Sequence, residues 1–220
     1  ALPILELINE QQPAKAMELL KRVSVDSNAG KVLPYAQFWL GELHYRNGSY
    51  DESIRNMNLF LSARPQAQGE ANTTSATYTL GYDWFQKGNY KQAAGYFEQV
   101  APSVSESSLP MVQDAWVRMA DCNYMLKDFG KAGSQYDRVI NSALPQADHA
   151  LYQKAVMAGV KNSSEKIRLL ESLKKQYPQS PLAKDVDMEV AMTYMADEKY
   201  AAAIPYLNAV IESGDEAGHP

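Results

Sequence analysis

Apolar residues recur at helical spacing along nearly the whole chain, interrupted by short polar turns, four of which share one pattern. In each of these turns an aromatic residue is followed three residues later by a small residue. The four turns read Gly48-Ser49-Tyr50-Asp51-Glu52-Ser53, Gly88-Asn89-Tyr90-Lys91-Gln92-Ala93, Lys127-Asp128-Phe129-Gly130-Lys131-Ala132 and Glu198-Lys199-Tyr200-Ala201-Ala202-Ala203. Each turn ends one helix-period stretch and begins another, so the pattern predicts pairs of helices.

The pattern repeats at a nearly constant interval. Two weaker copies of the second helix complete the series: Ala16–Val23 precedes the first full copy, and Lys166–Leu173 lies between the third and the fourth. The equivalent positions Ala16, Ser53, Ala93, Ala132, Lys166 and Ala203 are 37, 40, 39, 34 and 37 residues apart. A period of this length is typical of repeat proteins, in which each unit covers its apolar surface with its neighbours. We expect a single solenoid over residues 1–220, with approximate units 1–29, 33–65, 73–102, 112–145, 148–179 and 182–214.

Small and large residues alternate in a way that favours close packing within each pair. In the second full copy, Gly81 lies 12 residues before Ala93, and the large residue Phe97 lies four residues after it. Small side chains let two helices approach each other, and the large side chain then fills the remaining space. The predicted fold is therefore all-α, built from stacked antiparallel helix pairs.

These residues resemble the tetratricopeptide repeat family, whose pattern is W-x2-L-G-x2-Y, then A-x3-F, then P. One copy consists of Gln37, Leu40-Gly41, His44, Tyr50, Ser53, Met57 and Pro65, and the next consists of Leu80-Gly81, Trp84, Gly88, Tyr90, Ala93 and Phe97. Two further copies are Trp116, Met119-Ala120, Phe129, Ala132 and Tyr136, then Val190-Ala191, Tyr194, Tyr200, Ala203 and Leu207. The resemblance covers nearly the whole chain and implies a right-handed superhelical solenoid. Only Asp215–Pro220 follow the last copy, too few residues for a covering helix, so we expect a segment of a longer bacterial repeat protein. The resemblance slightly favours the cell envelope or periplasm over the cytoplasm.

Charge and composition exclude several classes of protein. The formal net charge of −5 argues against a nucleic-acid binder that relies on a basic face. No apolar run is long enough to cross a membrane, so direct membrane insertion is not expected. The lone cysteine, Cys122, has no partner for a disulfide and is interpreted as a small buried residue. We predict no catalytic residues, no metal site and no cofactor.

Two other groups of residues carry candidate chemistry. Asp114, Asp121 and Asp128 recur every seven residues, a spacing that could accept cations, but we interpret them as a solvated helix face. His44 occupies a packing position of the repeat and is interpreted as a core histidine with its hydrogen bonds satisfied. Neither group composes an active site, so the chain is predicted not to be an enzyme. The competing enzyme hypothesis would require a deep pocket with convergent titratable groups.

The remaining candidate is a surface. In the resembled family the first helices line a concave groove, and the equivalent positions here include aromatic side chains in successive units. Aromatic residues provide a large contact area with few torsions to immobilise, which suits binding. The predicted partner-binding residues are Phe38, Glu42, Tyr45, Tyr78, Tyr82, Phe85, Asp121, Tyr124, Met188 and Met192.

We therefore expect a non-enzymatic scaffold that holds a protein or peptide segment in an aromatic groove. Basic residues that match the family's carboxylate clamp are not apparent, so binding of acidic C-terminal tails is not expected. The alternative is a structural spacer of a larger repeat protein that stacks or self-associates through its ends. Light scattering separates these two interpretations, because concentration-dependent self-association through the ends favours the spacer. The sequence leaves open whether Met188, Met192 and Met195 form an exposed binding surface or are covered by a following repeat.

Overall fold

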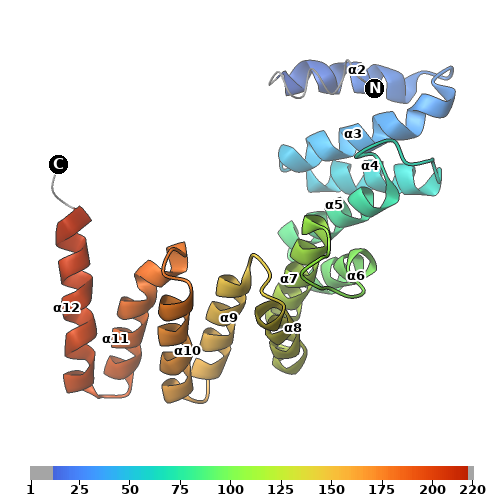
Figure 1. Cartoon of the computed structure of the whole chain (residues 1–220). Coiled ribbons are helices and arrows are strands. Elements are labelled where there is room, and N and C mark those ends of the chain that lie inside the picture. Colours follow the sequence, from blue (N-terminus) through green and yellow to red (C-terminus); the bar gives the residue numbers. More distant parts are fainter. Residues whose placement is uncertain (1–11, 218–220) are drawn as a thin grey trace. The chain divides into compact units, whose positions relative to one another are not determined.

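A computed structural model describes residues 12–217 of the chain, with side chains through residue 212. Within these residues the structure is all-α: eleven α-helices are joined by turns and two short 3-10 helices, and there is no β-strand. Consecutive helices pack as pairs (Figure 1). The all-α prediction and the prediction of helix pairs are both confirmed.

The chain divides into two compact units. Unit 1 comprises residues 1–104 and 109–128, and unit 2 comprises residues 105–108 and 129–220. The division falls within the predicted repeat 112–145, and the single solenoid over 1–220 stays a prediction. The helices of unit 1 are α2 (Pro13–Val25), α3 (Leu33–Arg46), α4 (Tyr50–Ser62), α5 (Thr73–Gln86), α6 (Tyr90–Val100) and α7 (Pro110–Met125). Those of unit 2 are α8 (Phe129–Asn141), α9 (Ala147–Gly159), α10 (Ser163–Gln176), α11 (Val186–Ala196) and α12 (Tyr200–Ala217).

Four equivalent turns end first helices in the same way. Gly48, Gly88, Lys127 and Glu198 all have a positive φ, between 59° and 74°. The next residue donates its backbone N–H to a carbonyl five residues earlier, as from Ser49 to His44 (2.8 Å) and from Asn89 to Trp84 (2.9 Å). This is the Schellman arrangement, which satisfies carbonyls at a helix C-terminus and reverses the chain. Lys127 and Glu198 adopt the left-handed conformation without the conformational freedom of glycine, so the turn is set by the repeat and does not require glycine.

The close approach of paired helices depends on glycine in unit 1. A Cβ atom on Gly41 would lie 2.9 Å from Met57 Cε, and a Cβ atom on Gly81 would lie 2.7 Å from Phe97 Cε1. Met57 and Phe97 are fully buried. The small-to-large pattern read from the sequence therefore describes a direct contact, in which a ring or thioether occupies the space that a side chain on the facing helix would need.

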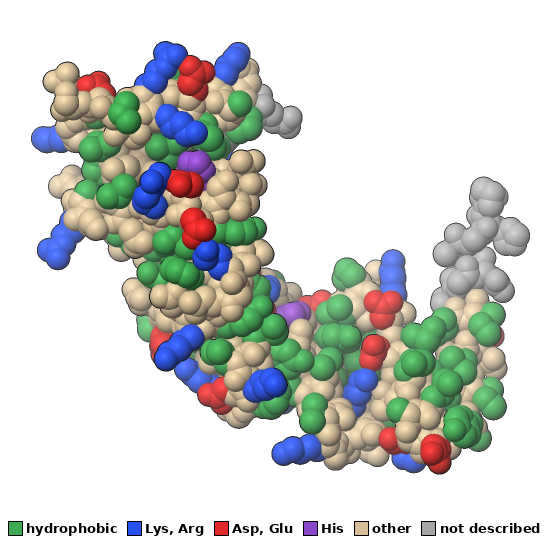
Figure 2. Space-filling model, turned by 180° about the vertical axis from the view of Figure 1, so that it is seen from behind, with side chains coloured by type: hydrophobic (Ala, Val, Ile, Leu, Met, Phe, Trp, Pro, Cys, Tyr) green, Lys and Arg blue, Asp and Glu red, His purple; other side chains and the backbone are tan. Residues whose placement is uncertain are grey.

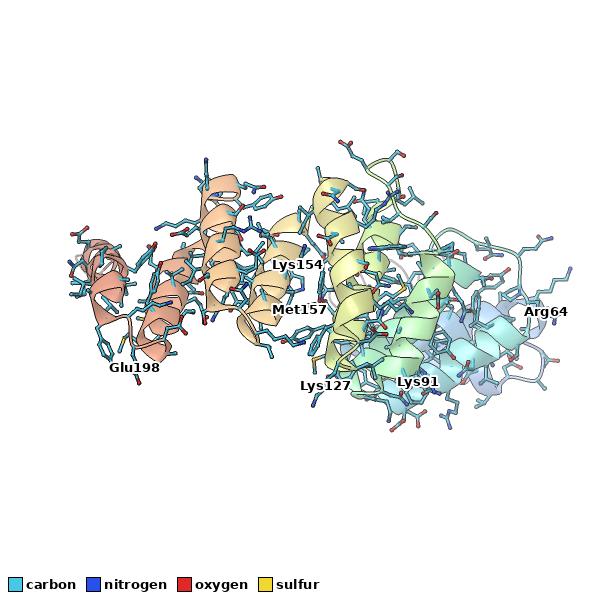
Figure 3. All side chains as sticks on the ribbon, turned by 90° about the horizontal axis from the view of Figure 1, so that it is seen from below. Arg64, Lys91, Lys127, Lys154, Met157 and Glu198 are labelled. Carbon is cyan, nitrogen blue, oxygen red and sulfur yellow. The ribbon has the colours of Figure 1, made fainter. Side chains whose placement is uncertain are left out.

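Unit 2 has its own core, formed by Leu169, Leu170 and Leu173 of α10 with residues of α9 and α11. Met157 of α9 reaches Gly133 of α8, where its Cε would lie 3.6 Å from an added Cβ. Lys154 of α9 forms an ion pair with Asp137 of α8. Figure 3 labels Lys154 and Met157 on the same helix. The helix pair α9 and α10 forms even though its turn, residues 160–162, lacks the aromatic residue of the four full copies.

The connection between α4 and α5 lies along one edge of unit 1. Gln68 and Ala71 form an isolated antiparallel bridge, and the Tyr35 hydroxyl donates to the Gln66 carbonyl at 2.9 Å. Asn72 then caps α5 by accepting from the Ser75 backbone N–H at 2.9 Å. These contacts fix the loop that carries Glu70 next to the first helices of unit 1.

Candidate functional site

Unit 1 contains a groove with a cavity volume of about 520 Å³, which is within the usual range for ligand sites. We call it the α3–α5 groove, because most of its lining comes from those two first helices. The loop before α5 and the start of α7 complete it. Its lining residues are Phe38, Glu42, Tyr45, Glu70, Ser75, Tyr78, Thr79, Tyr82 and Met111.

Five of the ten predicted binding residues meet in this groove: Phe38, Glu42, Tyr45, Tyr78 and Tyr82. The repeat explains why they meet. Phe38 and Tyr78 occupy equivalent positions 40 residues apart, and so do Glu42 and Tyr82. Because α3 and α5 are successive first helices, equivalent positions on them face the same side of the unit.

The groove tyrosines are held by a carboxylate on the next first helix. The hydroxyls of Tyr78 and Tyr82 both donate to Oδ2 of Asp114, the Tyr78 bond being 2.7 Å long. Burial and these bonds to Asp114 raise the pKa of both phenols, so both rings stay protonated. The ring centroids of Tyr78 and Tyr82 are 5.0 Å apart, and that of Tyr45 is 6.2 Å from that of Tyr82.

The interpretation of Asp114 and Asp121 as part of a solvated face is wrong. Arg118 contacts both carboxylates, with Nη1 2.6 Å from Asp121 Oδ2 and Nε 3.4 Å from Asp114 Oδ1. The side chains of Asp114 and Asp121 are only 19% and 11% exposed. Spacing alone did not reveal that the previous repeat covers this face of α7 with Tyr78 and Tyr82. Asp128, at the end of the stripe, is exposed.

Glu42 is the half-buried carboxylate of the groove. The Thr79 hydroxyl donates to its Oε1 at 2.6 Å and also contacts the Ser75 carbonyl at 3.1 Å. Burial raises the pKa of Glu42, while the Thr79 bond and the charge of Arg46 act in the opposite direction. Arg46 itself is exposed near the end of α3 and does not line the groove.

The predicted residues differ in how they are placed. Phe38 is 1% exposed and forms the floor of the groove. Phe85 packs against Tyr90 at a centroid distance of 5.4 Å and is not a lining residue. Asp121 forms an ion pair with Arg118, as described above. Tyr124 is half-buried on α7, outside the groove.

The predicted methionines lie in unit 2, apart from the α3–α5 groove. Met188, Met192 and Met195 on α11 are 43%, 55% and 41% exposed. Met192 also lines a smaller cavity of about 340 Å³ with residues of α9, α10 and α11. The methionine stripe is therefore exposed in the described structure.

Four lining residues were not among the ten predicted: Glu70, Ser75, Thr79 and Met111. Glu70 lies in the loop before α5, whose path over the first helices a helical pattern cannot indicate. Thr79 follows Tyr78 by one residue, and its hydroxyl could have been proposed as a partner for Glu42 from the 37-residue separation. Met111 begins the next first helix and reaches the groove only because α7 packs beside α5.

Other candidate chemistry in the described residues is limited. Cys122 is fully buried, as predicted, and burial raises the pKa of its thiol to about 12. His44 is half-buried, but its Nδ1 has no hydrogen-bond partner among the described residues, so the prediction of a fully satisfied histidine is wrong. The described part of the chain contains no cluster of His, Cys, Asp or Glu that could hold a metal ion. Among residues 12–217, no helix combines the length and apolar character needed to cross a membrane.

Comparison with known families gives a match to the model of the tetratricopeptide repeat over residues 78–155. The matched span begins in α5 and ends in α9, and the paired helices on both sides of it follow the same pattern. Residues 78–155 therefore match tetratricopeptide repeats. No curated protein sequence matches the chain.

Solved structures of tetratricopeptide repeat proteins share the fold at low sequence identity. A repeat protein from Parabacteroides merdae ATCC 43184 aligns with a TM-score of 0.70 and 16% identity, over 96% of this chain and 77% of that chain. MamA (residues 41 to the end) from Desulfovibrio magneticus RS-1 aligns with a TM-score of 0.65 and 14% identity, over 84% of this chain and 97% of that chain. YrrB, described as a tetratricopeptide repeat protein with an unusual peptide-binding site, aligns with a TM-score of 0.64 and 16% identity, over 82% of this chain and 86% of that chain.

The tetratricopeptide repeat fold is that of a protein–protein interaction scaffold, and its members bind protein or peptide partners. Members of the family are generally scaffolds without enzymatic activity.

Proposed function

We propose that this chain is a non-enzymatic scaffold that binds a peptide segment of a partner protein in the α3–α5 groove. The supporting observation is that aromatic and carboxylate side chains from two successive repeats line one cavity of unit 1. Hydrogen bonds hold the main groove side chains in place: Tyr78 and Tyr82 donate to Asp114, and Glu42 accepts from Thr79. A preorganised surface loses little conformational entropy when it binds, so more of the contact energy appears as affinity.

A blocking substitution tests the groove without removing a core residue. Ser75 lines the groove on α5, and its side chain is only partly buried. The Ser75→Trp variant should fill the cavity with an indole ring and lower the affinity for groove-binding peptides at least about tenfold. The probe is a displayed library of random 12-residue peptides, selected on the wild-type chain and then measured one by one by fluorescence anisotropy.

Thr74→Trp is the matched control, because Thr74 is the exposed neighbour of Ser75 and does not line the groove. It should bind the selected peptides like the wild type. If both tryptophan variants retain full affinity, or if selection yields no binder, the groove is not the peptide site.

A second function, as a structural spacer that self-associates, has a separate observation in its favour. Met192 on α11 and Tyr200 and Ile204 on α12 are between 55% and 62% exposed. Figure 2 shows hydrophobic side chains gathered on the part of unit 2 that carries these helices. Exposed apolar surface of this kind is typical of contact sites between proteins.

Self-association through α11 and α12 predicts a mass that rises with concentration. Light scattering after size exclusion should then show dimers or larger species for the wild type. The double substitution of Met192 and Ile204 by glutamate should return the protein to a monomer, because a charge in an apolar contact is costly to desolvate. Leu59→Glu is the control in unit 1, since Leu59 is 47% exposed. A wild type that stays monomeric at every concentration would count against the spacer.

A further inference from the structure

The α3–α5 groove is acidic as well as aromatic. Of the nine described residues that line it, Glu42 and Glu70 are acidic and none is basic. Glu70 is exposed at the rim, whereas Glu42 is half-buried and its pKa is raised by that burial. A carboxylate that loses water on burial is stabilised by a nearby positive charge, so the groove favours a cationic occupant.

The positive side chains around the groove do not line it. Arg46, whose charge acts on Glu42, is exposed and is not a lining residue. Arg118 contacts Asp114 and Asp121, and it does not line the cavity. Lys87 contacts Asp51 at 2.6 Å and lies over the ring of Trp84. The chain therefore supplies no basic side chain to the described lining of the groove, and a cation there would come from a partner.

The aromatic lining suits the same occupant. The rings of Tyr45 and Tyr82 line the cavity with their centroids 6.2 Å apart, beside the Glu42 carboxylate. An ammonium or guanidinium group is attracted to the face of a tyrosine ring, and the attraction grows when the cation is partly desolvated. Because the Tyr82 hydroxyl donates to Asp114, the ring is held in place and its polar end is already satisfied.

The apolar part of the lining suits the methylene groups of a lysine or arginine side chain. Phe38 and Met111 are apolar, and the cavity of about 520 Å³ is larger than one side chain needs. Lysine and arginine place their methylene groups on apolar surface while the charged end reaches polar groups. The space that remains can hold the residues on either side in the partner segment.

We propose that the α3–α5 groove recognises a basic peptide segment, with one lysine or arginine placed against the rings of Tyr45 and Tyr82 and paired with Glu42 and Glu70. This inference rests on the proposed function, that the groove binds peptides, and it adds the chemistry of the partner. The two carboxylates supply selectivity for charge, and the rings supply contact area. A segment with glutamate in place of this lysine or arginine would meet two like charges in a partly desolvated cavity.

Parallel selections test the charge preference. The random 12-residue library is selected on the wild type and on the double variant Glu42→Gln/Glu70→Gln. The amide oxygen that Glu42→Gln introduces can still accept the Thr79 hydroxyl, so the fold of the groove is retained. Peptides from the wild type should be enriched several-fold in lysine and arginine, and this enrichment should be absent from the double variant.

Affinities of individual peptides give the second measurement. Replacing the basic residue of a selected peptide by glutamine should lower its affinity for the wild type about tenfold and leave its affinity for the double variant unchanged. Glu98→Gln, an exposed carboxylate on α6 outside the groove, is the control and should behave like the wild type. Glu70→Lys should weaken the preference for basic peptides more than Glu70→Gln does, because it adds a positive charge at the exposed rim while Glu42 remains.

The outcomes separate the two proposals. If peptides bind and Ser75→Trp blocks them, but lysine and arginine are not enriched, the groove remains the site and the basic partner is overturned. If no library peptide binds in a manner sensitive to Ser75→Trp, both proposals fail. Enrichment of basic residues that persists in the double variant also overturns the role of Glu42 and Glu70.

Discussion

Replacing Gly81 by alanine is expected to destabilise unit 1 by about 1–2 kcal/mol, although alanine is the better helix former by about 1 kcal/mol. An added Cβ would lie 2.7 Å from Phe97 Cε1 and 2.8 Å from Phe97 Cδ1. Phe97 cannot move away freely, because its ring also packs against Tyr82 and Tyr78 at centroid distances of 5.2 and 6.2 Å. The substitution should therefore disturb both the helix pair and the groove tyrosines.

Tryptophan fluorescence during urea unfolding measures this effect in unit 1, because Trp39, Trp84 and Trp116 all lie there and are the only tryptophans of the chain. Gly95→Ala on α6 is the matched control. Nothing lies within 4 Å of a Cβ at Gly95, so this variant should gain about 0.5–1 kcal/mol. Phe97→Leu should rescue part of the Gly81→Ala loss in a double-mutant cycle, since it frees space at the contact. Additive effects would mean that Gly81 and Phe97 do not interact as described.

The second large effect concerns Asp83, and it should appear in the pH dependence of stability. Asp83 is fully buried on α5, where the Ser53 hydroxyl of α4 donates to its Oδ2 at 2.8 Å. Its Oδ1 has no hydrogen-bond partner among the described residues. Burial raises the pKa of Asp83 to about 7 from an ordinary value of 3.8, against the lowering effect of Ser53.

The sign of the pH dependence follows from the number of protons that Asp83 binds in the folded and unfolded states. Between pH 4 and pH 7 the folded state holds a proton on Asp83 that the unfolded state has lost, so stability decreases as the pH rises through this window. From pH 5 to pH 8 the wild type should lose roughly 2–3 kcal/mol of unfolding free energy relative to Asp83→Asn, which cannot ionise. Urea unfolding at several pH values, followed by tryptophan fluorescence, gives this difference directly.

Glu98→Gln is the control for removing a carboxylate, because Glu98 is exposed and should show no such dependence on pH. A difference in unfolding free energy between wild type and Asp83→Asn that stays constant from pH 5 to pH 8 would contradict the raised pKa.

The hydrogen bond to Asp83 also explains one departure from the repeat pattern. Ser53 occupies the position where Ala93 and Ala132 stand in the next copies, and its hydroxyl provides the hydrogen bond that Asp83 receives.

The sequence predicts those residues of the candidate site that occupy equivalent positions of the repeat. It does not predict those that reach the site through a loop or through the packing of a neighbouring helix. Phe38, Glu42, Tyr45, Tyr78 and Tyr82 follow from equivalent positions on first helices, and all five line the groove. Phe85 has the same helical register, but it packs against Tyr90 at the turn of its own pair. Helical register indicates a face of a helix, whereas the packing of the next helix decides which part of that face stays open.

The sequence by itself determined the helix pairs, because the constraint that defines them is local and repeated. Gly41 with Met57 and Gly81 with Phe97 must alternate small and large side chains for two helices to nest, so the spacing is visible in the chain. Only the tertiary structure decided the charge and the openness of the groove. Glu70 lies in the loop before α5, and Asp114 on α7 accepts hydrogen bonds from Tyr78 and Tyr82 on α5. Neither the position of Glu70 nor the contacts of Asp114 produce a periodic pattern in the sequence. Contacts between residues that are distant in sequence and not related by the repeat become apparent only when the elements are packed.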